Sequence, residues 1–118
     1  MLQITAKHNI FIAIQPVDFR RGIDGLASYC RKILIADPMS GHVFIFRNKK
    51  AKAIKVLMYD SQGFWLCIKR LSHGKFNWWP KSRQLAMRLS VPQLHSLLWN
   101  TQPSPQALQQ WQPINTDE

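Results

Sequence analysis

Apolar residues alternate with a period of two along much of the chain, which predicts a β-sheet. In residues 8–14, HNIFIAI, the side chains of Ile10, Ile12 and Ile14 fall on one side of an extended chain. Phe11 and Ala13 fall on the other, so this strand is expected to be buried on both faces. Similar patterns, bounded by turn-forming residues, cover residues 42–46, 53–60, 64–71, 75–79 and 84–90. We therefore expect an antiparallel β-meander of about five to six strands.

Two segments follow the helical period instead. Residues 19–34, FRRGIDGLASYCRKIL, carry apolar side chains at i, i+3, i+4 and i+7 spacing, and Asp18 is suited to cap the first turn. Further along, Ser90 and Gln93 have the spacing of a capping box, with a proline in the first turn, which predicts a short helix over 91–100. The predicted fold class is therefore α+β, with the meander packed against a helix from the N-terminal half and a short C-terminal helix.

The length of 118 residues is suited to one compact domain. We assign residues 1–100 to a single α+β domain. Residues 101–118 are rich in Pro and Gln and contain no basic residue, which predicts an extended or disordered tail. No apolar run approaches the roughly 20 residues of a membrane span, and the first residues lack the pattern of a signal peptide. These features predict a cytoplasmic protein, associated with the nucleoid if it binds DNA.

Charge is the strongest compositional signal. Sixteen Lys and Arg residues face six Asp and Glu, which gives a formal net charge of +10. Two of the acidic residues are Asp117 and Glu118, so residues 1–100 carry sixteen basic against four acidic side chains, a formal charge of +12. A small domain this basic is attracted to polyanions, of which nucleic acid is the most plausible.

The residues needed for catalysis or metal binding are sparse. Two-metal nuclease and transposase chemistry needs clustered carboxylates, whereas the predicted domain has only Asp18, Asp24, Asp37 and Asp60. The four histidines lack metal-ligand spacing, and there is no glycine-rich phosphate loop. Cys30 and Cys67 stand among apolar residues and are expected to be buried free thiols. We therefore predict neither enzymatic activity, nor a metal site, nor a cofactor.

The basic residues gather around two predicted turns and the start of the first helix. Connectors 48–52 and 72–75 are expected at the same end of the meander, with the 60–63 turn at the other. Lysines at such tips also occur simply because water solvates them and because they discourage edge pairing. No carboxylate interrupts residues 38–59, however, so we predict a nucleic-acid-binding surface. Its candidate members are Arg20, Arg21, Arg47, Lys49, Lys50, Lys52, Lys55, Lys69, Arg70 and Lys75.

Three tryptophans allow more than one interpretation. Trp65, Trp78 and Trp79 exceed what one small core readily hides, and adjacent residues in an extended segment point to opposite faces. They are candidates for a protein-partner surface. Plain core packing and stacking on unpaired bases are the alternatives.

Several motifs resemble a known bacterial family. Residues 18–26, DFRRGIDGL, are similar to its D-M-R-K-G-x-D-G-L signature, and FIFRNKK, KVLMYDSQGFWL, KRLSHGKFNWWP and SVPQLHSLL follow in the family's order. This is the TnpB-type accessory protein, the second reading frame product of three-gene insertion sequences, and not the RNA-guided nuclease of the same name. The resemblance covers residues 8–99. Phe19 replaces the commoner methionine, and Asn100 stands where glycine is frequent.

The resemblance implies a protein needed for transposition beside a separate transposase, but it brings no DNA-contacting residues with it. Together with the charge, it predicts a non-catalytic accessory protein that binds DNA, assists the transposase, or does both. The alternative is an assembly module for the transposase with no direct role on DNA. The sequence leaves open the oligomeric state and whether the target is the element's ends, any duplex or the transposase surface.

Overall fold

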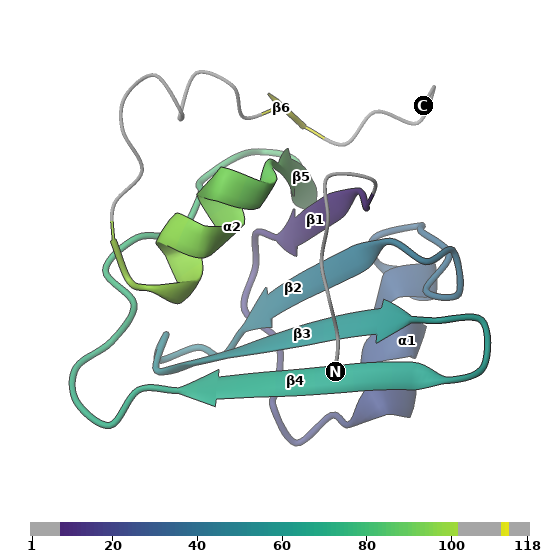
Figure 1. The fold of residues 1–118 in the computed structure, drawn as a ribbon, viewed down its shortest axis with the longest axis horizontal. Helices are drawn as coiled ribbons and strands as arrows, with labels where there is room; N and C mark the ends of the chain where they lie inside the picture. Colours follow the sequence, from purple (N-terminus) through teal and green to yellow (C-terminus); the bar gives the residue numbers. More distant parts are fainter. Residues whose placement is uncertain (1–7, 102–111, 114–118) are drawn as a thin grey trace.

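One mixed sheet organises the protein. The computed structural model describes residues 8–101 and 112–113, and in this part the strands are ordered β4-β3-β2-β1-β5-β6 (Figure 1). The strands are β1 (Ile10–Ala13), β2 (Val43–Arg47), β3 (Ala53–Tyr59), β4 (Phe64–Arg70), β5 (Ala86–Leu89) and the two-residue β6 (Gln112–Pro113). The helices are α1 (Ile23–Lys32) and α2 (Val91–Leu98). The predicted α+β class is confirmed.

The antiparallel meander is confined to β2, β3 and β4. β1 lies between β2 and β5, parallel to β2 and antiparallel to β5, with Ile10 opposite both Val43 and Leu89. The reason is α1, which returns the chain to the starting end of the sheet before β2 begins. The sheet is thus mostly antiparallel with one parallel pair.

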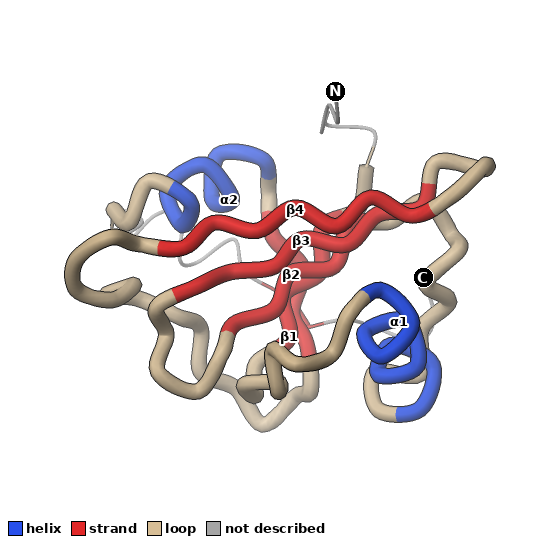
Figure 2. The backbone as a smooth tube through the Cα atoms, turned by 90° about the horizontal axis from the view of Figure 1, so that it is seen from below, coloured by secondary structure: helices blue, strands red, loops and turns tan. Residues whose placement is uncertain are grey.

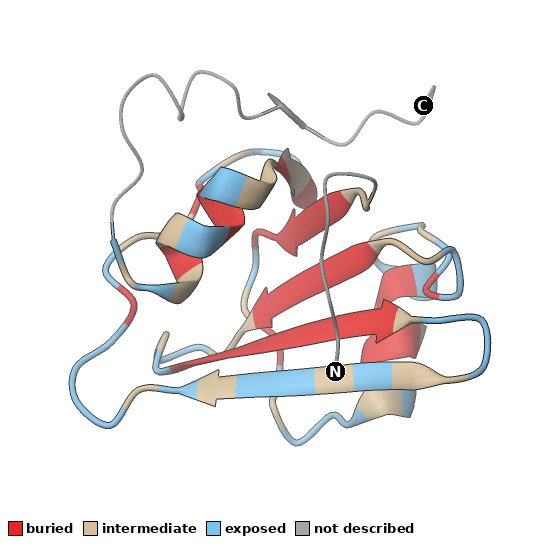
Figure 3. Ribbon diagram, viewed as in Figure 1, coloured by how far each residue is buried: buried red, intermediate tan, exposed pale blue. Residues whose placement is uncertain are grey.

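The two helices lie on opposite faces of the sheet (Figure 2). One core contains Ile12, Ile45 and Val56 from the sheet with Leu94 and Leu97 from α2. The core of the other face contains sheet residues such as Phe44 and Leu57, with Leu26 and Cys30 from α1. Both faces are therefore covered, which explains why β1 and β2 are apolar on both sides (Figure 3).

The start of α1 differs from the prediction. The helix begins at Ile23, and its N-cap, Gly22, has no side-chain cap. Asp18 instead accepts hydrogen bonds from the backbone and guanidinium of Arg20 in the preceding turn. The prediction that Asp18 caps the helix is therefore wrong, because its carboxylate bonds to Arg20 in a turn, five residues before the helix begins.

The start of α2 follows the prediction. Ser90 Oγ accepts a hydrogen bond of 3.2 Å from the backbone N–H of Gln93, and Gln93 Oε1 accepts one of 2.7 Å from the N–H of Ser90. This reciprocal capping box confirms the sequence interpretation. By contrast, residues 75–79 form no strand, and this irregular segment becomes one wall of the site described next.

Candidate nucleic-acid interface

The connector between β2 and β3 is a tight turn with two lysines at its tip. The Asn48 side chain accepts a hydrogen bond of 2.9 Å from the backbone N–H of Lys52, and the Asn48 carbonyl accepts one of 3.0 Å from Ala51. These bonds close the turn over Lys49 and Lys50, whose side chains are exposed. The turn thus holds two positive charges away from the sheet.

The segment after β4 lies against this turn. Leu71 N–H donates to the Lys52 carbonyl over 2.9 Å, and Phe76 N–H donates to the Ala51 carbonyl over 2.7 Å. Ala53 pairs with Arg70 at this end of the sheet, whereas Tyr59 pairs with Phe64 at the other. The expectation that the two basic connectors share one end is therefore confirmed.

Asn100 fastens the same segment to the end of α2. Its Oδ1 accepts a hydrogen bond of 2.8 Å from Asn77 N–H, and its Nδ2 donates one of 3.2 Å to the Lys75 carbonyl. Asn100 has a φ of 59°, a left-handed conformation that asparagine tolerates better than most residues. Phe76, only 5% exposed, anchors the segment in the core.

Between the connector and this segment lies a cavity of about 750 Å³. Four of the predicted basic residues line it, and most of the other lining residues are aromatic or apolar. No carboxylate is among the lining residues in the described part of the chain. The lining consists of Arg47, Lys49, Lys50, Ala51, Lys75, Phe76, Asn77, Trp78, Trp79, Pro80, Lys81 and Met87.

Two of the lining residues, Arg47 and Trp79, are held against the sheet. The Trp79 Nε1–H donates a hydrogen bond of 2.9 Å to the Ala13 carbonyl of β1, and the Arg47 guanidinium lies 5.6 Å from the centre of the Trp79 ring. Arg47 Nη2 also donates to the Ile14 carbonyl over 3.4 Å. Burial lowers the pKa of Arg47 from its ordinary value. These contacts fix both side chains against the sheet.

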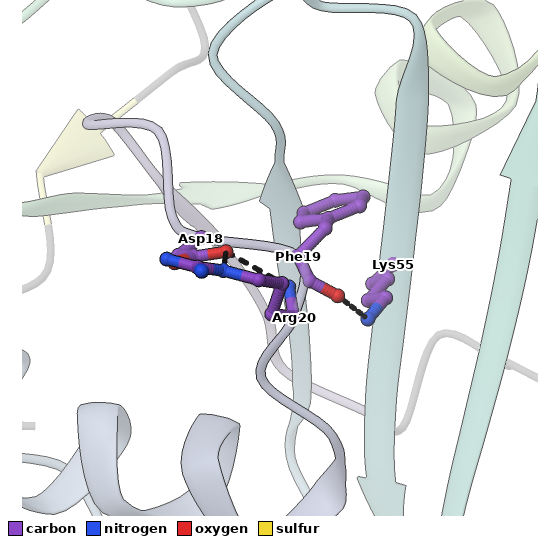
Figure 4. Close-up of polar contacts among 4 residues, drawn as sticks. All are labelled: Asp18, Phe19, Arg20 and Lys55. Carbon is purple, nitrogen blue, oxygen red and sulfur yellow. Dashed lines mark hydrogen bonds and ion pairs between the residues drawn. The ribbon is translucent and has the colours of Figure 1, made fainter.

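Lys55 does not belong to this surface. It is 6% exposed, and its ammonium donates a hydrogen bond of 2.8 Å to the Phe19 carbonyl (Figure 4). A second hydrogen bond, of 2.9 Å, goes to the Arg21 carbonyl. The ammonium also lies 4.8 Å from the centre of the Phe19 ring. Lys55 was predicted from the sequence to be a nucleic-acid-binding residue, and the structure corrects this. Side chains alternate between the two faces of β3, and Lys55 points toward the face that α1 covers.

The other predicted basic residues are spread over the molecule. Arg20 forms an ion pair of 2.7 Å with Asp18. Arg21, just before the start of α1, lies over the ring of Tyr29. Lys69 donates to the Leu98 carbonyl at the end of α2 and lies 5.2 Å from the ring centre of Trp99. Lys52 and Arg70 are exposed near the two connectors but do not line the cavity.

The three tryptophans do not form one face. Trp78 and Trp79 are half-buried and line the cavity, together with the basic residues. Trp65 belongs to β4, pairs with Met58 near the 60–63 turn, and donates a hydrogen bond of 2.7 Å from Nε1 to Asp60. The sequence interpretation grouped these residues, but the structure separates Trp65 from the other two.

Sequence reasoning missed Lys81 and Asn77. Lys81 follows Trp-Trp-Pro outside any predicted turn, and only the return of residues 75–81 past the β2–β3 connector brings it to the cavity. The absence of carboxylates from residues 61–100 was a usable signal, because it places every basic residue there in an uncompensated environment.

The prediction that both cysteines are buried holds for only one of them. Cys30 is buried, as predicted, but Cys67 on β4 is exposed, so its assignment to the core is wrong. It faces outward because β4 is an edge strand of the described sheet and α2 does not extend over it.

Within residues 8–101, no three His, Cys, Asp or Glu side chains are grouped to hold a metal. No helix in these residues is long and apolar enough to cross a membrane.

Comparison with known proteins places the chain in a family. The profile of the IS66 Orf2-like proteins matches residues 8–106. The chain therefore belongs to the IS66 Orf2-like family. This confirms the resemblance to the second reading frame product of an insertion sequence, a family associated with transposition.

Two relatives come from Sinorhizobium fredii. The uncharacterized protein y4jC is 40% identical over 89 residues, which cover 75% of this chain and 74% of the relative. The uncharacterized protein y4hO is 36% identical over 98 residues, which cover 83% of this chain and 84% of the relative. No solved structure matches this IS66 Orf2-like chain.

Proposed function

We propose that this protein is a non-catalytic accessory factor of transposition that binds DNA through the basic cavity and its rim and assists a separate transposase. One observation carries the DNA-binding part. Five basic residues from two segments, 47–50 and 75–81, lie around one cavity, and none of the described residues that line it is a carboxylate. Phosphate contacts of Lys and Arg supply most of the affinity of non-specific DNA binding.

The structure favours binding with little sequence preference. Base reading in the major groove usually employs an exposed helix that carries polar side chains. α2 contains no Lys or Arg, and α1 buries Leu26, Ala27 and Cys30 against the sheet. α2 therefore presents no basic reading surface, and the basic residues of α1, Arg31 and Lys32, lie only in its last turn. The cavity rim, by contrast, presents several phosphate-binding groups.

A titration tests this proposal. The chain is titrated against a duplex containing the element's terminal repeats and against a scrambled duplex, at several salt concentrations and with or without the transposase. If about five phosphates are contacted, log K falls with log salt at a slope of roughly −4 to −5. Absence of binding at low salt, or an affinity independent of salt, contradicts DNA binding.

A second surface is a candidate for the transposase. β4 is an edge strand of the described sheet, and Trp65 and Ile68 on it are 41% and 60% exposed. An exposed strand edge with large apolar side chains is suited to pairing with another chain. Trp65→Ala is expected to reduce capture of the transposase while leaving DNA affinity unchanged. Undiminished capture contradicts this contact and leaves DNA binding as the sole proposed role.

A further inference from the structure

Trp78 and Trp79 line the same cavity as the positive charges, and this combination suggests a more specific ligand than a phosphate backbone. We propose that the cavity receives an unpaired nucleotide of DNA, with its base against Trp78 and its phosphates among the lysines of the rim. This inference rests on the proposed function, because it names the form of DNA that the same site takes.

The lining chemistry matches the two halves of a nucleotide. Lys49, Lys50 and Lys81 supply cations to phosphate oxygens, and the indole of Trp78 supplies a planar surface for a base. Asn77 also belongs to the lining, and an asparagine side chain has both donor and acceptor groups for a base edge. Stacking on aromatic side chains combined with a basic groove is how proteins hold unpaired nucleic acid.

Trp79 has a different role from Trp78. Its Nε1–H is bonded to the Ala13 carbonyl and the Arg47 guanidinium lies over its ring, so Trp79 forms a fixed wall. We assign stacking to Trp78, which packs against the same core as Trp79, is half-buried and lines the cavity.

The size of the cavity suits a single nucleotide. Its volume of about 750 Å³ lies in the range of roughly 300–1,000 Å³ that is typical of small-ligand pockets. The bases of an intact duplex are paired and stacked inside the helix, so paired DNA offers phosphates to the lysines but no free base to Trp78. A base that is unpaired, or extruded from a duplex, can enter.

The wall is built before any ligand arrives. Phe76 anchors it in the core and donates to the Ala51 carbonyl, and Asn100 holds the backbone on both sides of Phe76, at Lys75 and Asn77. A wall fixed in this way loses little conformational entropy on binding, which favours affinity.

A nucleic-acid strand fits better than a free nucleotide. Lys49 and Lys50 also line a second cavity of about 430 Å³, together with Val17, Phe19 and Asp18, whose carboxylate is paired with Arg20. The exposed Lys52 follows on the same connector. The connector therefore carries three exposed lysines, which can contact more than one phosphate of a strand.

The test compares four probes at fixed salt: an oligothymidine strand, a duplex of equal length, the same duplex with a central bulge, and thymidine monophosphate. Tryptophan fluorescence is expected to be quenched by the single strand and by the bulged duplex, and scarcely by the intact duplex. Trp78→Leu is expected to weaken binding of the single strand roughly tenfold, within the range of lost base stacking, and to change duplex affinity less than twofold. Trp78→Phe retains most of the single-strand affinity, because a phenyl ring still stacks.

Trp99→Leu is the matched control, because Trp99 is 77% exposed and does not line the cavity. Equal quenching by intact and bulged duplexes, or an equal loss for both in Trp78→Leu, overturns the inference but leaves duplex binding intact. Monophosphate binding as tight as that of the strand also overturns it. If Trp78→Leu does not fold, the comparison of the four probes with the wild-type protein and the affinity of Trp78→Phe for the single strand test the inference. Loss of all salt-dependent binding instead identifies failure of the proposed function.

Discussion

The ammonium of Lys55 donates a hydrogen bond of 2.8 Å to the backbone carbonyl of Phe19, a residue 36 positions earlier in the chain. A second bond, to the Arg21 carbonyl, makes Lys55 a clamp between the middle of β3 and the segment that leads into α1. This lysine belongs to the sequence's most basic stretch, yet its surroundings are those of a structural residue.

Replacement of Lys55 by Met is expected to lower the free energy of unfolding by about 2 kcal/mol. Methionine preserves much of the packing of the lysine stem, but two charge-assisted hydrogen bonds are lost. Urea unfolding measures the change. Lys52→Met removes the same charge from an exposed position and is expected to shift stability by less than about 0.5 kcal/mol. A change that small in Lys55→Met contradicts the structural assignment.

The double variant Lys49→Gln, Lys50→Gln is expected to weaken DNA binding and make the salt slope shallower by about 1.8, because each lost phosphate contact removes roughly 0.9. Thermal melting should be nearly unchanged, since both side chains are exposed. Arg31→Gln, Lys32→Gln removes equal charge at the exposed end of α1, outside the cavity lining. Equal salt slopes in the two double variants would show that DNA affinity depends on the net charge alone and not on the position of the lysines.

Asp18 is expected to titrate well below an ordinary aspartate. Its hydrogen bond from the Arg20 side chain, assisted by the Arg20 backbone N–H, lowers the pKa of the carboxyl from 3.8 to about 2. A depressed folded-state pKa stabilises the fold above pH 3.8, and this contribution is lost as the pH falls toward 2. Carboxylate NMR measures the midpoint directly. Arg20→Gln returns it toward 3.8, whereas Arg83→Gln leaves it low; an unchanged midpoint in Arg20→Gln excludes the Arg20 contact as the cause.

The two thiols are expected to react at very different rates. Burial raises the pKa of the Cys30 thiol to about 12, whereas Cys67 is exposed on β4. Because the thiolate is the reactive form, a disulfide reagent at pH 8 should modify one thiol per native chain rapidly and the second only after unfolding. Mass spectrometry assigns the sites. Cys67→Ser removes the fast phase and Cys30→Ser preserves it, and rapid modification of both thiols shows that α1 does not protect Cys30.

Local signals predicted the elements that depend on nearby residues. The alternation in β3 and β4 located both strands within one residue at each end, and the Ser90 and Gln93 spacing located α2. The position of β1 could not be read in this way, because parallel pairing with β2 depends on where α1 sends the chain. Residues 75–79 alternate like a strand, but Asn77 N–H is bonded to the side chain of Asn100, just after α2, rather than to a neighbouring strand.

The candidate site shows the same division. The lysines of the β2–β3 turn were recognisable from their density, and the shared end of the two connectors from the meander. The structural role of Lys55 was not recognisable from the sequence, because a run of lysines does not show which of them points inward. Lys81 and the joining of Trp78 with the basic residues depend on hydrogen bonds between segments far apart in the chain.

The place of β1 in the sheet has a consequence for synthesis. This strand leaves the ribosome before every other described element, yet one of its edges pairs with β5, which is made after β2, β3 and β4. Until residues 86–89 emerge, that edge of a wholly apolar strand has no sheet partner. The nascent chain can form the hairpins of β2, β3 and β4 early, but it pairs the second edge of β1 only after β5 has been made, and until then β1 is a natural client for a chaperone.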